Sequence, residues 1–381
     1  MLVFRTIYEN EPSSRAEIAR KTRLTRAAVS EIVRELLQEG WIYEGGVVSG
    51  RVGKPPTLLR IAEDGRCFIG VDLSNEQYRG ALFNLRGRIQ HQVDWPLQAP
   101  QGEGALAHVF ELIDALWAAA TAPVLGIGVG TPGVVDIEEG IVHQAVNRGW
   151  ENLPLKALLS RRYGVPVYVA NDSHMTALAE YRFGVREGIR NLVAIKIGEG
   201  IGAGVVLEGR LLGGDSHAAG EIGHLVVVES GEVCTCGNRG CLETVASVRA
   251  LLRQARRRIQ EHPDSRLAAL CRERGTLGLG EIREALEQGD AVARGLVEEA
   301  GRALGIAIAA TVSVLDVEHV VICGEGASLG APFLNAAAAE ARRRILSRVA
   351  DRLQIRLSTL GKEAVMLGAS AMIMAQVLHL R

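Results

Sequence analysis

The sequence contains no uncharged apolar run of the roughly 18 residues that a transmembrane helix needs, so we expect no membrane span. Residues 1–6 lack the basic start and the long apolar stretch of a secretory signal peptide, which predicts a cytoplasmic protein. Net charge is almost absent as well, at −1 for 43 basic and 44 acidic side chains. Hydrophobic residues make up 48% and charged residues 23%, a balance that excludes a globally disordered chain.

The length of 381 residues suggests two or three domains at roughly 150 residues each. The charged residues are distributed unevenly between them. Residues 1–60 hold ten Lys and Arg against seven Asp and Glu, so this segment carries +3 and the remainder carries −4. A small basic segment on an acidic body is the distribution expected when only the small segment meets nucleic acid.

The basic segment has the pattern of a helix-turn-helix. Residues 2–8 have the apolar spacing of a short amphipathic helix. Ser14 and Glu17 have the spacing of a capping box at the start of a second helix, and Thr25 can cap a third helix that Gly40 ends. Two helices joined by a turn of about three to four residues, the second of them basic, are typical of this motif.

Two short strands, at 41–44 and 57–61, follow the helices and predict a β-hairpin wing, which completes a winged helix-turn-helix over residues 1–61. The outward side chains of the third helix are short or basic, so this helix can lie close in a major groove while the wing reaches the backbone or the minor groove. The predicted DNA contacts are Arg15, Thr25, Arg26, Ser30, Arg34, Arg51 and Lys54. The alternative is that the module makes only protein contacts.

The remaining residues, 66–381, repeat one α/β pattern. A strand at 68–72 is followed by two antiparallel strands and then by alternating helices and strands, and the same order begins again near residue 192. This pattern predicts two related lobes around a cleft. We place the first lobe at about 66–180 with the C-terminal helix 363–381, and the second lobe at about 181–362.

Three of the six cysteines lie within eight residues, at Cys234, Cys236 and Cys241, with glycines between them for tight turns. Three thiolates at this spacing fit a structural zinc site, and His224 upstream can supply the fourth ligand, which predicts a zinc knuckle over 224–243. The alternatives are a disulfide, which the cytoplasm disfavours, or inert thiols. The other cysteines lie in apolar contexts and are predicted to be core residues: Cys67, Cys271 and Cys323.

Polar residues gather before and around this knuckle. Asn171 and Asp172 end one strand and open a helix predicted at 172–183, and Glu221 and Glu243 bracket the metal loop. Clustered carboxylates and an amide accept hydrogen bonds from the hydroxyls of a polyhydroxylated ligand, and Asp172 could act as general base on one hydroxyl. Simple N-capping by Asp172 is the alternative.

A glycine-rich segment, 198–204, lies between two predicted strands. Such glycines let backbone N–H groups approach a phosphate, although a glycine-rich β-turn has the same composition.

Together these residues resemble the ROK family, named for repressors, open reading frames and sugar kinases, over nearly the whole chain. The most specific part is the Cys234-x-Cys236-Gly237-x-x-Gly240-Cys241-x-Glu243 signature, joined to Gly220-Glu221-Ile222-Gly223-His224. Supporting residues are Gly128-x-x-Thr131-Pro132-Gly133, Asn147 with Trp150, Asn171-Asp172 and Gly324. The resemblance implies an actin-like body, related to RNase H-like sugar kinases and ATPases, and the winged helix resembles the repressor branch.

The resemblance also implies roles for single residues. Sugar hydroxyls are expected to contact Asn147, Asn171, Asp172, Glu221, His224 and Glu243. Zinc is expected at His224, Cys234, Cys236 and Cys241. In the kinases of the family, the residue that matches Asp172 is the catalytic base.

Two phosphate-binding motifs depart from the kinase pattern, at Asp72, Ser74 and Glu76 and at Gly198, Glu199, Gly200 and Gly202. Ser74 replaces a glycine, and Glu76 and Glu199 replace threonines. A carboxylate about 4 Å from a phosphate oxygen costs roughly 1 kcal/mol in water and about 4 kcal/mol in a partly buried site. Each lost donor adds about 1–3 kcal/mol. We therefore expect that neither ATP nor Mg is a cofactor, and that these loops are vestigial.

The sequence therefore predicts a sugar-responsive transcriptional repressor that binds operator DNA as a homodimer or a dimer of dimers, leaves it when a sugar binds, and carries one structural zinc. The alternative is an ATP-dependent sugar kinase of the glucokinase type with an added DNA-binding head. A third possibility is a repressor controlled by a protein partner that contacts the acidic body.

Overall fold

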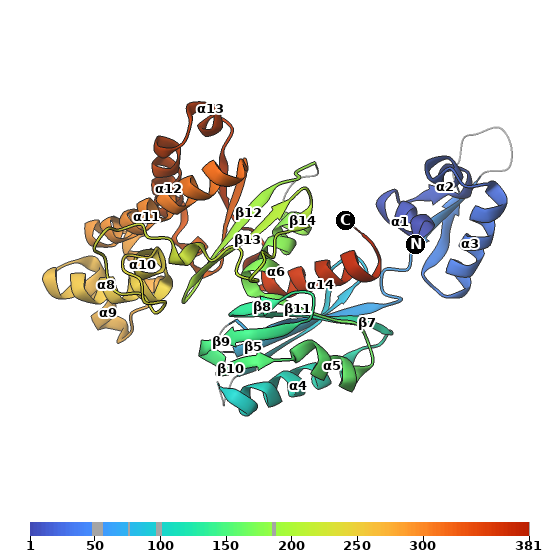
Figure 1. Ribbon diagram of the computed structural model, residues 1–381, viewed down its shortest axis with the longest axis horizontal. Coiled ribbons are helices and arrows are strands. Elements are labelled where there is room, and N and C mark those ends of the chain that lie inside the picture. Colours follow the sequence, from blue (N-terminus) through green and yellow to red (C-terminus); the bar gives the residue numbers. More distant parts are fainter. Residues whose placement is uncertain (48–55, 75–76, 97–100, 185–187, 381) are drawn as a thin grey trace. The chain divides into compact units, whose positions relative to one another are not determined.

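The computed structural model describes residues 1–47, 56–74, 77–96, 101–184 and 188–380 (Figure 1). The chain forms two compact units: unit 1 comprises Met1–Asp172 and Val365–Arg381, and unit 2 comprises Ser173–Ala364. The sequence-based division lay near residues 180 and 362, a few residues away from these boundaries. Within the described ranges, no helix is long and apolar enough to span a membrane.

Residues 1–47 and 56–61 belong to a small head within unit 1, where the described residues form three helices and a three-stranded antiparallel sheet of order β1-β3-β2. The elements are α1 (Leu2–Glu9), β1 (Ser13–Ser14), α2 (Arg15–Thr22), α3 (Arg26–Gln38), β2 (Ile42–Val47) and β3 (Thr57–Ile61). The predicted capping box is confirmed, because the Ser14 side chain accepts a hydrogen bond from Glu17 N while the Glu17 carboxylate accepts one from Ser14 N. Buried Phe4, Ile18 and Val33 contribute to its core.

The body of unit 1 is a five-stranded sheet of order β11-β7-β4-β5-β6. Its strands are β4 (Cys67–Asp72), β5 (Gln77–Asn84), β6 (Ile89–Pro96), β7 (Val124–Thr131) and β11 (Val167–Asn171). β4, β7 and β11 are parallel, whereas β5 and β6 continue the sheet antiparallel. Helices α4 (Gly102–Ala119) and α5 (Leu155–Tyr163) lie on one face, and α14 (Ala364–Val377) lies on the other (Figure 1).

Unit 2 repeats this plan with a sheet of order β14-β13-β12-β15-β16. Its strands are β12 (Leu192–Ile197), β13 (Ile201–Leu207), β14 (Arg210–Leu211), β15 (His319–Cys323) and β16 (Gln354–Leu357). The central strand pairs antiparallel with a hairpin partner on one side and parallel with the next strand on the other, as β4 does in unit 1. The expectation of two related α/β lobes is therefore confirmed.

Successive side chains of β12 point to opposite faces of the sheet and so contribute to two different cores of unit 2. Val193 and Ile195 pack in a large core with helices α11 (Ala291–Leu315) and α12 (Gly330–Arg344). Ala194 points to the other face, where it packs with Ala177 of helix α6 (Asp172–Ala179). Unit 2 also contains α7 (Glu243–Ala246), α8 (Val248–Glu261), α9 (Arg266–Arg274), α10 (Leu279–Glu287) and α13 (Ser347–Ala350).

The structure contains several elements that were not expected from the sequence. Unit 1 has a second small sheet of three strands, β8 (Val134–Asp136), β9 (Ile141–Ala145) and β10 (Trp150–Leu153). Unit 2 has helices α8, α9 and α10, which were not predicted. The helix expected at 172–183 stops at Ala179 and continues as a π-helical turn, Glu180–Gly184.

Candidate functional sites

Three parallel strands of unit 1 bring candidate residues to one edge of the sheet. Asp72, Thr131 and Asn171 are the last residues of β4, β7 and β11, and the register pairs Asn171 with Thr131 and Asp72 with Gly130. The carboxyl ends of parallel strands are the usual place for ligands in open α/β sheets. The sequence-predicted residues Asn171 and Asp172 thus lie where such a site is expected.

Local contacts fix these side chains. Asn171 Nδ2 donates to Gly133 O at 2.9 Å, and Gly133 has a φ of +97°, which favours glycine. Asp172 is the first residue of α6 and is buried. Asn147 is exposed in the 3-10 turn between β9 and β10.

Arg148, which follows Asn147, is a buried residue of this region that sequence reasoning missed. Its Nε and Nη2 donate to Leu73 O at 3.3 and 2.9 Å. Its guanidinium carbon lies 5.2 Å from the ring centroid of Tyr78. Burial raises the pKa of Tyr78 to about 12. No local pattern in the sequence indicates that this arginine turns inward across the loop after β4.

That loop holds the first of the two predicted vestigial phosphate motifs. Asp72 is buried, and its Oδ1 accepts hydrogen bonds from Ser74 N at 2.8 Å and from the Ser74 hydroxyl. Ser74 thus binds within its own loop. Glu76, the other residue of this motif, lies outside the described residues.

The second motif is a three-residue turn between β12 and β13 of unit 2. Gly198 N donates to Gly200 O at 2.9 Å, and Ile201 N donates to Glu243 Oε2 at 3.2 Å. Glu199 is exposed at the tip, and Gly202 follows within β13. Two of the N–H groups that a phosphate could use therefore have protein acceptors already.

Glu243 is tied to this turn from the start of α7. A Cβ atom on Gly200 would lie 2.6 Å from Glu243 Oε2, so a larger residue there would displace the carboxylate from its present position. Glu243 Oε1 accepts a hydrogen bond from Arg249 Nη2 at 3.0 Å, across the cap between α7 and α8. Arg249 was missed because nothing in its sequence context distinguishes it from other arginines of the basic helix α8.

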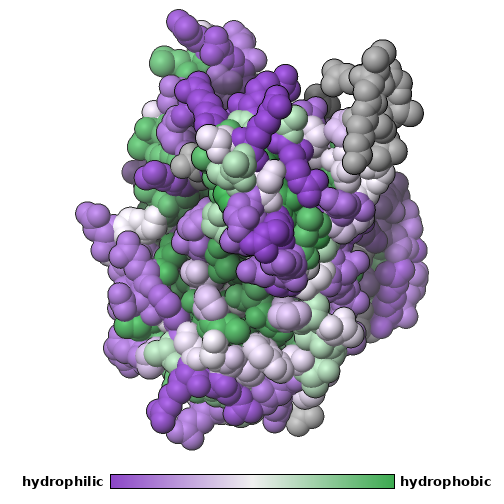
Figure 2. Space-filling view, turned by 90° about the vertical axis from the view of Figure 1, so that its right-hand side faces the viewer, coloured by the Kyte–Doolittle hydropathy of each residue, from purple (hydrophilic) through white to green (hydrophobic). Residues whose placement is uncertain are grey.

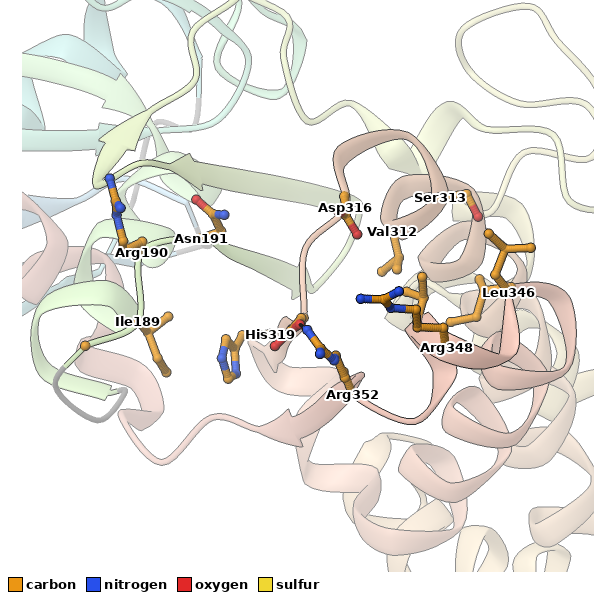
Figure 3. A pocket seen from close by; sticks show the side chains of 14 residues that line it. Ile189, Arg190, Asn191, Val312, Ser313, Asp316, His319, Leu346, Arg348 and Arg352 are labelled. Atoms are coloured by element: carbon orange, nitrogen blue, oxygen red, sulfur yellow. Dashed lines mark hydrogen bonds and ion pairs between the residues drawn. The ribbon is translucent and has the colours of Figure 1, made fainter.

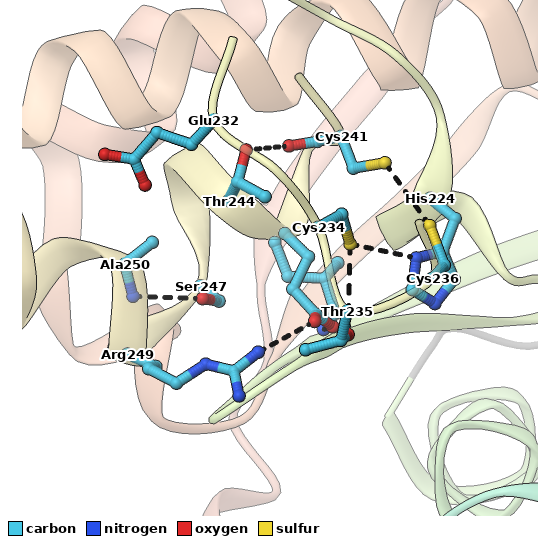
Figure 4. Close-up of polar contacts among 12 residues, drawn as sticks. His224, Glu232, Cys234, Thr235, Cys236, Cys241, Thr244, Ser247, Arg249 and Ala250 are labelled. Carbon is cyan, nitrogen blue, oxygen red and sulfur yellow. Dashed lines mark hydrogen bonds and ion pairs between the residues drawn. The ribbon is translucent and has the colours of Figure 1, made fainter. Parts of the chain in front are cut away.

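The predicted zinc ligands converge in unit 2 (Figure 4). The Nδ1 or Nε2 atom of His224 and the sulfur atoms of Cys234, Cys236 and Cys241 all lie within 4.8 Å of one another. Cys236 Sγ is 3.7 Å from Cys241 Sγ, and Cys234 Sγ is 3.5 Å from His224 Nδ1. Zn–S and Zn–N bonds of about 2.3 and 2.0 Å give tetrahedral S–S and S–N separations of roughly 3.8 and 3.5 Å. The four side chains could therefore hold a tetrahedral metal ion.

The knuckle and β13 together position Glu221 and His224. Ala203 N donates to Gly220 O at 2.8 Å, and a Cβ atom at Gly220 would overlap Ala203 O. With His224 Nδ1 facing the thiols, Nε2 lies 3.7 Å from Glu221 Oε2. Within unit 2, the four candidate metal ligands and the residues expected to bind sugar therefore lie in one short segment.

The head displays the predicted DNA contacts that the structure describes. Thr25, Arg26, Ser30 and Arg34 are exposed on α3, and Arg15 at the start of α2 pairs with Glu44 at 2.9 Å. The space-filling view shows hydrophilic side chains around a central group of hydrophobic ones (Figure 2). The wing residues Arg51 and Lys54 lie outside the described residues.

The Arg26 side chain has no hydrogen bond or ion pair within the described part of the chain, whereas the Arg34 side chain pairs with Glu31 on its own helix. The Arg26 guanidinium is therefore available to a phosphate or a base edge.

A pocket of about 750 Å³ lies elsewhere in unit 2 (Figure 3). It is lined by residues that precede β12 and by residues at the end of α11 and around α13, among them Arg190, His319 and Arg348. None of the predicted site residues lines it.

Comparisons with known proteins cover both parts of the chain. Residues 68–376 match the ROK family, and residues 1–44 match the MarR family. The chain is 31% identical to a xylose repressor from Caldicellulosiruptor bescii, over 99% of this chain and 96% of that protein.

Among the solved structures, a regulator matches nearly the whole chain and a glucokinase matches a smaller part of it. The structure of a ROK family transcriptional regulator, a homolog of the E. coli MLC protein, matches with a TM-score of 0.86 and 31% identity, covering 98% of this chain and 94% of that one. A ROK family glucokinase from Streptomyces griseus in complex with glucose and AMPPNP matches with a TM-score of 0.73 and 30% identity. That match covers 98% of the glucokinase and 80% of this chain.

Proposed function

The chain belongs to the ROK family, and from this premise we propose that it is a DNA-binding transcriptional regulator, a repressor that a bound sugar releases from its operator. The observation that carries the proposal is the extent of the similarity. The regulators match 98–99% of the chain, including the head, whereas the glucokinase structure matches 80%. A basic helix-turn-helix joined to a sugar-kinase-like body combines the two binding functions that such a regulator needs.

We propose that the side chains expected to bind sugar hydroxyls are the effector ligands of this chain: Asn147, Asn171, Asp172, Glu221, His224 and Glu243. These side chains offer carboxylate, amide and imidazole groups, which can bind the hydroxyls of a sugar. Each Glu243 oxygen has one protein donor and keeps capacity to accept another. D-Xylose is the first sugar to test, because the matching repressor from C. bescii is named for xylose.

Zinc is the metal that we propose for the cluster of one histidine and three cysteines. Cys234 and Cys241 are buried and Cys236 is exposed, and four protein ligands suit a structural zinc site because they fill the tetrahedral coordination sphere. The His224 ring faces the thiols with Nδ1 and Glu221 with Nε2, an arrangement in which an outer carboxylate orients a metal-bound imidazole. The bound ion would fix the segment that carries Glu221, His224 and Glu243.

Loss of nucleotide binding is the part of the proposal that separates a sensor from a kinase. Glu199 brings a carboxylate to the tip of the glycine-rich turn, and Glu243 accepts one of the N–H groups in that turn. Both features oppose the binding of a triphosphate: the Glu199 carboxylate repels the phosphate charge, and Glu243 occupies an N–H group that a phosphate oxygen would need. Without a phosphoryl donor, Asp172 has no catalytic step to serve as general base and acts as a sugar ligand.

The proposal includes a homodimer or a dimer of dimers that acts on DNA in the cytoplasm. A helix-turn-helix protein reads two half-sites about one helical turn apart, so a two-fold protein matches a palindromic operator.

A thermal-unfolding scan tests this proposal. The purified protein is heated with D-xylose, D-glucose or N-acetyl-D-glucosamine, each with and without Mg-ATP. A ligand at 100 times its Kd adds about 2.7 kcal/mol to the free energy of unfolding, which raises the midpoint measurably. We expect one sugar to raise it and Mg-ATP to add nothing. A further rise with Mg-ATP, followed by turnover of that sugar, would identify a kinase instead.

A further inference from the structure

The turn between β5 and β6 holds an arginine that contacts the head. Arg86 Nη1 donates to Tyr8 O at 2.9 Å, and Nη2 donates to the Glu11 carboxylate. The guanidinium carbon lies 4.1 Å from the centroid of the Tyr8 ring, within cation–π range. On the body side, Arg86 Nε lies 3.7 Å from Glu63 Oε1. One guanidinium therefore contacts the end of α1, the segment after it and the body of unit 1.

The head returns a hydrogen bond to the same turn. Tyr8 Oη donates to Leu85 O at 2.8 Å, and Leu85 N donates to Glu63 O at 2.9 Å. Tyr8 and Leu85 are both buried, so little water competes for these bonds. Arg86 itself has a largely buried side chain, with 22% exposed. These contacts hold α1 at a fixed angle to the turn.

A second arginine attaches the end of α3. Arg66 Nη2 donates to Glu39 O at 2.8 Å, and its guanidinium carbon lies 4.3 Å from the centroid of the Trp41 ring. The helix proposed to enter the major groove is thus also held by the body of unit 1.

The opposite end of β5 lies beside the residues proposed to bind sugar. Tyr78, the second residue of β5, packs under Arg148, and Arg148 follows Asn147 in the chain. β5 pairs with β4 from Arg79 to Asn84 without a register shift, and with β6 with a shift between Leu82 and Phe83. The regular β4 ladder therefore connects the Tyr78 end of β5 to the turn that holds Arg86. The eight residues of β5 span roughly 26 Å, from the loop after β4 to the turn that holds Arg86.

We propose that Arg86 is the positioning residue of the DNA-binding head, and that it transmits the sugar-bound state from β5 to α1. This inference rests on the proposed function. Sugar contacts that move Asn147 and Arg148 shift β5, and the turn then pulls Tyr8 and Glu11 with it. Arg86 contacts neither the sugar nor the DNA, so its loss separates the two binding events without abolishing either one.

The test compares Arg86→Ala with Arg88→Ala in the full chain. Arg88 is a matched control, because it lies in the same turn, has 75% of its side chain exposed and, among the residues that the structure describes, forms an ion pair with Glu63 alone, at 3.4 Å. The DNA probe is a duplex selected from a random pool by the unaltered chain. The sugar is whichever of D-xylose, D-glucose and N-acetyl-D-glucosamine raises its unfolding temperature. Operator Kd is measured with and without sugar, and sugar Kd is measured separately.

We expect Arg86→Ala to keep its sugar Kd while the sugar-dependent ratio of operator Kd values falls by roughly tenfold, within the usual range of coupling between sites. Arg88→Ala should keep both quantities. An unchanged ratio in folded Arg86→Ala overturns the inference. If Arg86→Ala does not fold, Arg86→Lys replaces it, since lysine keeps the charge and loses the paired donors. Absence of any sugar response in the unaltered chain would instead refute the proposed function.

Discussion

Replacing one ligand of the metal cluster should couple metal content, stability and sugar binding. The change is Cys241→Ser, which replaces the sulfur of a buried cysteine with a hydroxyl, a poor zinc ligand. The Sγ–Sγ and Sγ–Nδ1 distances of 3.7 and 3.5 Å already match a tetrahedral ion, so binding needs little rearrangement. The binding free energy of structural zinc in small domains is about 10–16 kcal/mol, which is about 3 kcal/mol for each of its four ligands. Zinc affinity should fall by roughly a hundredfold.

Sugar affinity should fall with the zinc. The knuckle holds Glu221 and His224 on one side and Glu243 on the other, and Leu242 N donates to Leu225 O at 2.8 Å between them. A loosened loop must be ordered again by the sugar, which reduces the apparent affinity.

The assays are zinc content by metal analysis after a mild chelator wash, the unfolding midpoint, and sugar Kd by calorimetry. Cys271→Ser is the control, because Cys271 is a cysteine of unit 2 outside the cluster. The unaltered chain and the control should each retain one zinc per chain, and Cys241→Ser should lose it. Equal zinc content and equal sugar Kd in all three proteins would refute the reasoning.

Three further changes test other parts of the structure. Arg26→Ala should weaken operator binding by roughly 5- to 150-fold in an anisotropy titration, whereas Arg20→Ala on α2 serves as a control expected to have a smaller effect. Ser14→Ala should lower the free energy of unfolding by about 1 kcal/mol at pH 7. The Ser14 backbone N–H and then its hydroxyl donate to the Glu17 carboxylate and lower its pKa, and the substitution removes only the hydroxyl's bond. The stabilisation from that bond is present above the ordinary glutamate pKa and is lost as pH falls through the folded-state pKa, so the deficit in the free energy of unfolding should shrink in denaturant titrations near pH 3. Gly220→Ala should reduce the yield of folded protein, because φ is +92° and the new Cβ would overlap Ala203 O, whereas Gly280→Ala in α10 meets nothing within 4 Å and should be neutral or stabilising.

Much of the fold was predictable because its signals are local. The capping box at Ser14 and the buried strand at 67–72 are each encoded within a few residues, and both were predicted to within two residues. The three strands β8, β9 and β10 were missed, since three to five residues are too few to establish a period of two.

The early end of α6 has a cause far away in the sequence. The fully buried Glu180 carboxylate accepts hydrogen bonds from Arg356 Nη2 at 2.7 Å and from the Ser358 hydroxyl. A Cβ at Gly184 would overlap this carboxylate. The π-helical turn accommodates these contacts, whose partners lie about 176 residues along the chain, beyond the range of any local pattern.

The candidate sites also include residues with a local signal in the sequence and residues without one. The cysteine spacing predicted the metal cluster, because all of its thiols lie within one loop. Arg148 and Arg249 were not predicted, since each acts on a group that only the folded chain brings near: Leu73 O for Arg148 and the Glu243 carboxylate for Arg249.

Operator affinity measured with and without sugar tests the central claim most directly. The unaltered full chain is titrated into a labelled duplex that it has selected from a random pool, at one fixed salt concentration, because DNA affinity depends steeply on salt. Each sugar of the panel is then added at saturation. The account predicts that one sugar weakens operator binding by at least fivefold, the lower end of ordinary allosteric coupling. Operator affinity that no sugar changes, in a protein that binds one of those sugars, would contradict it.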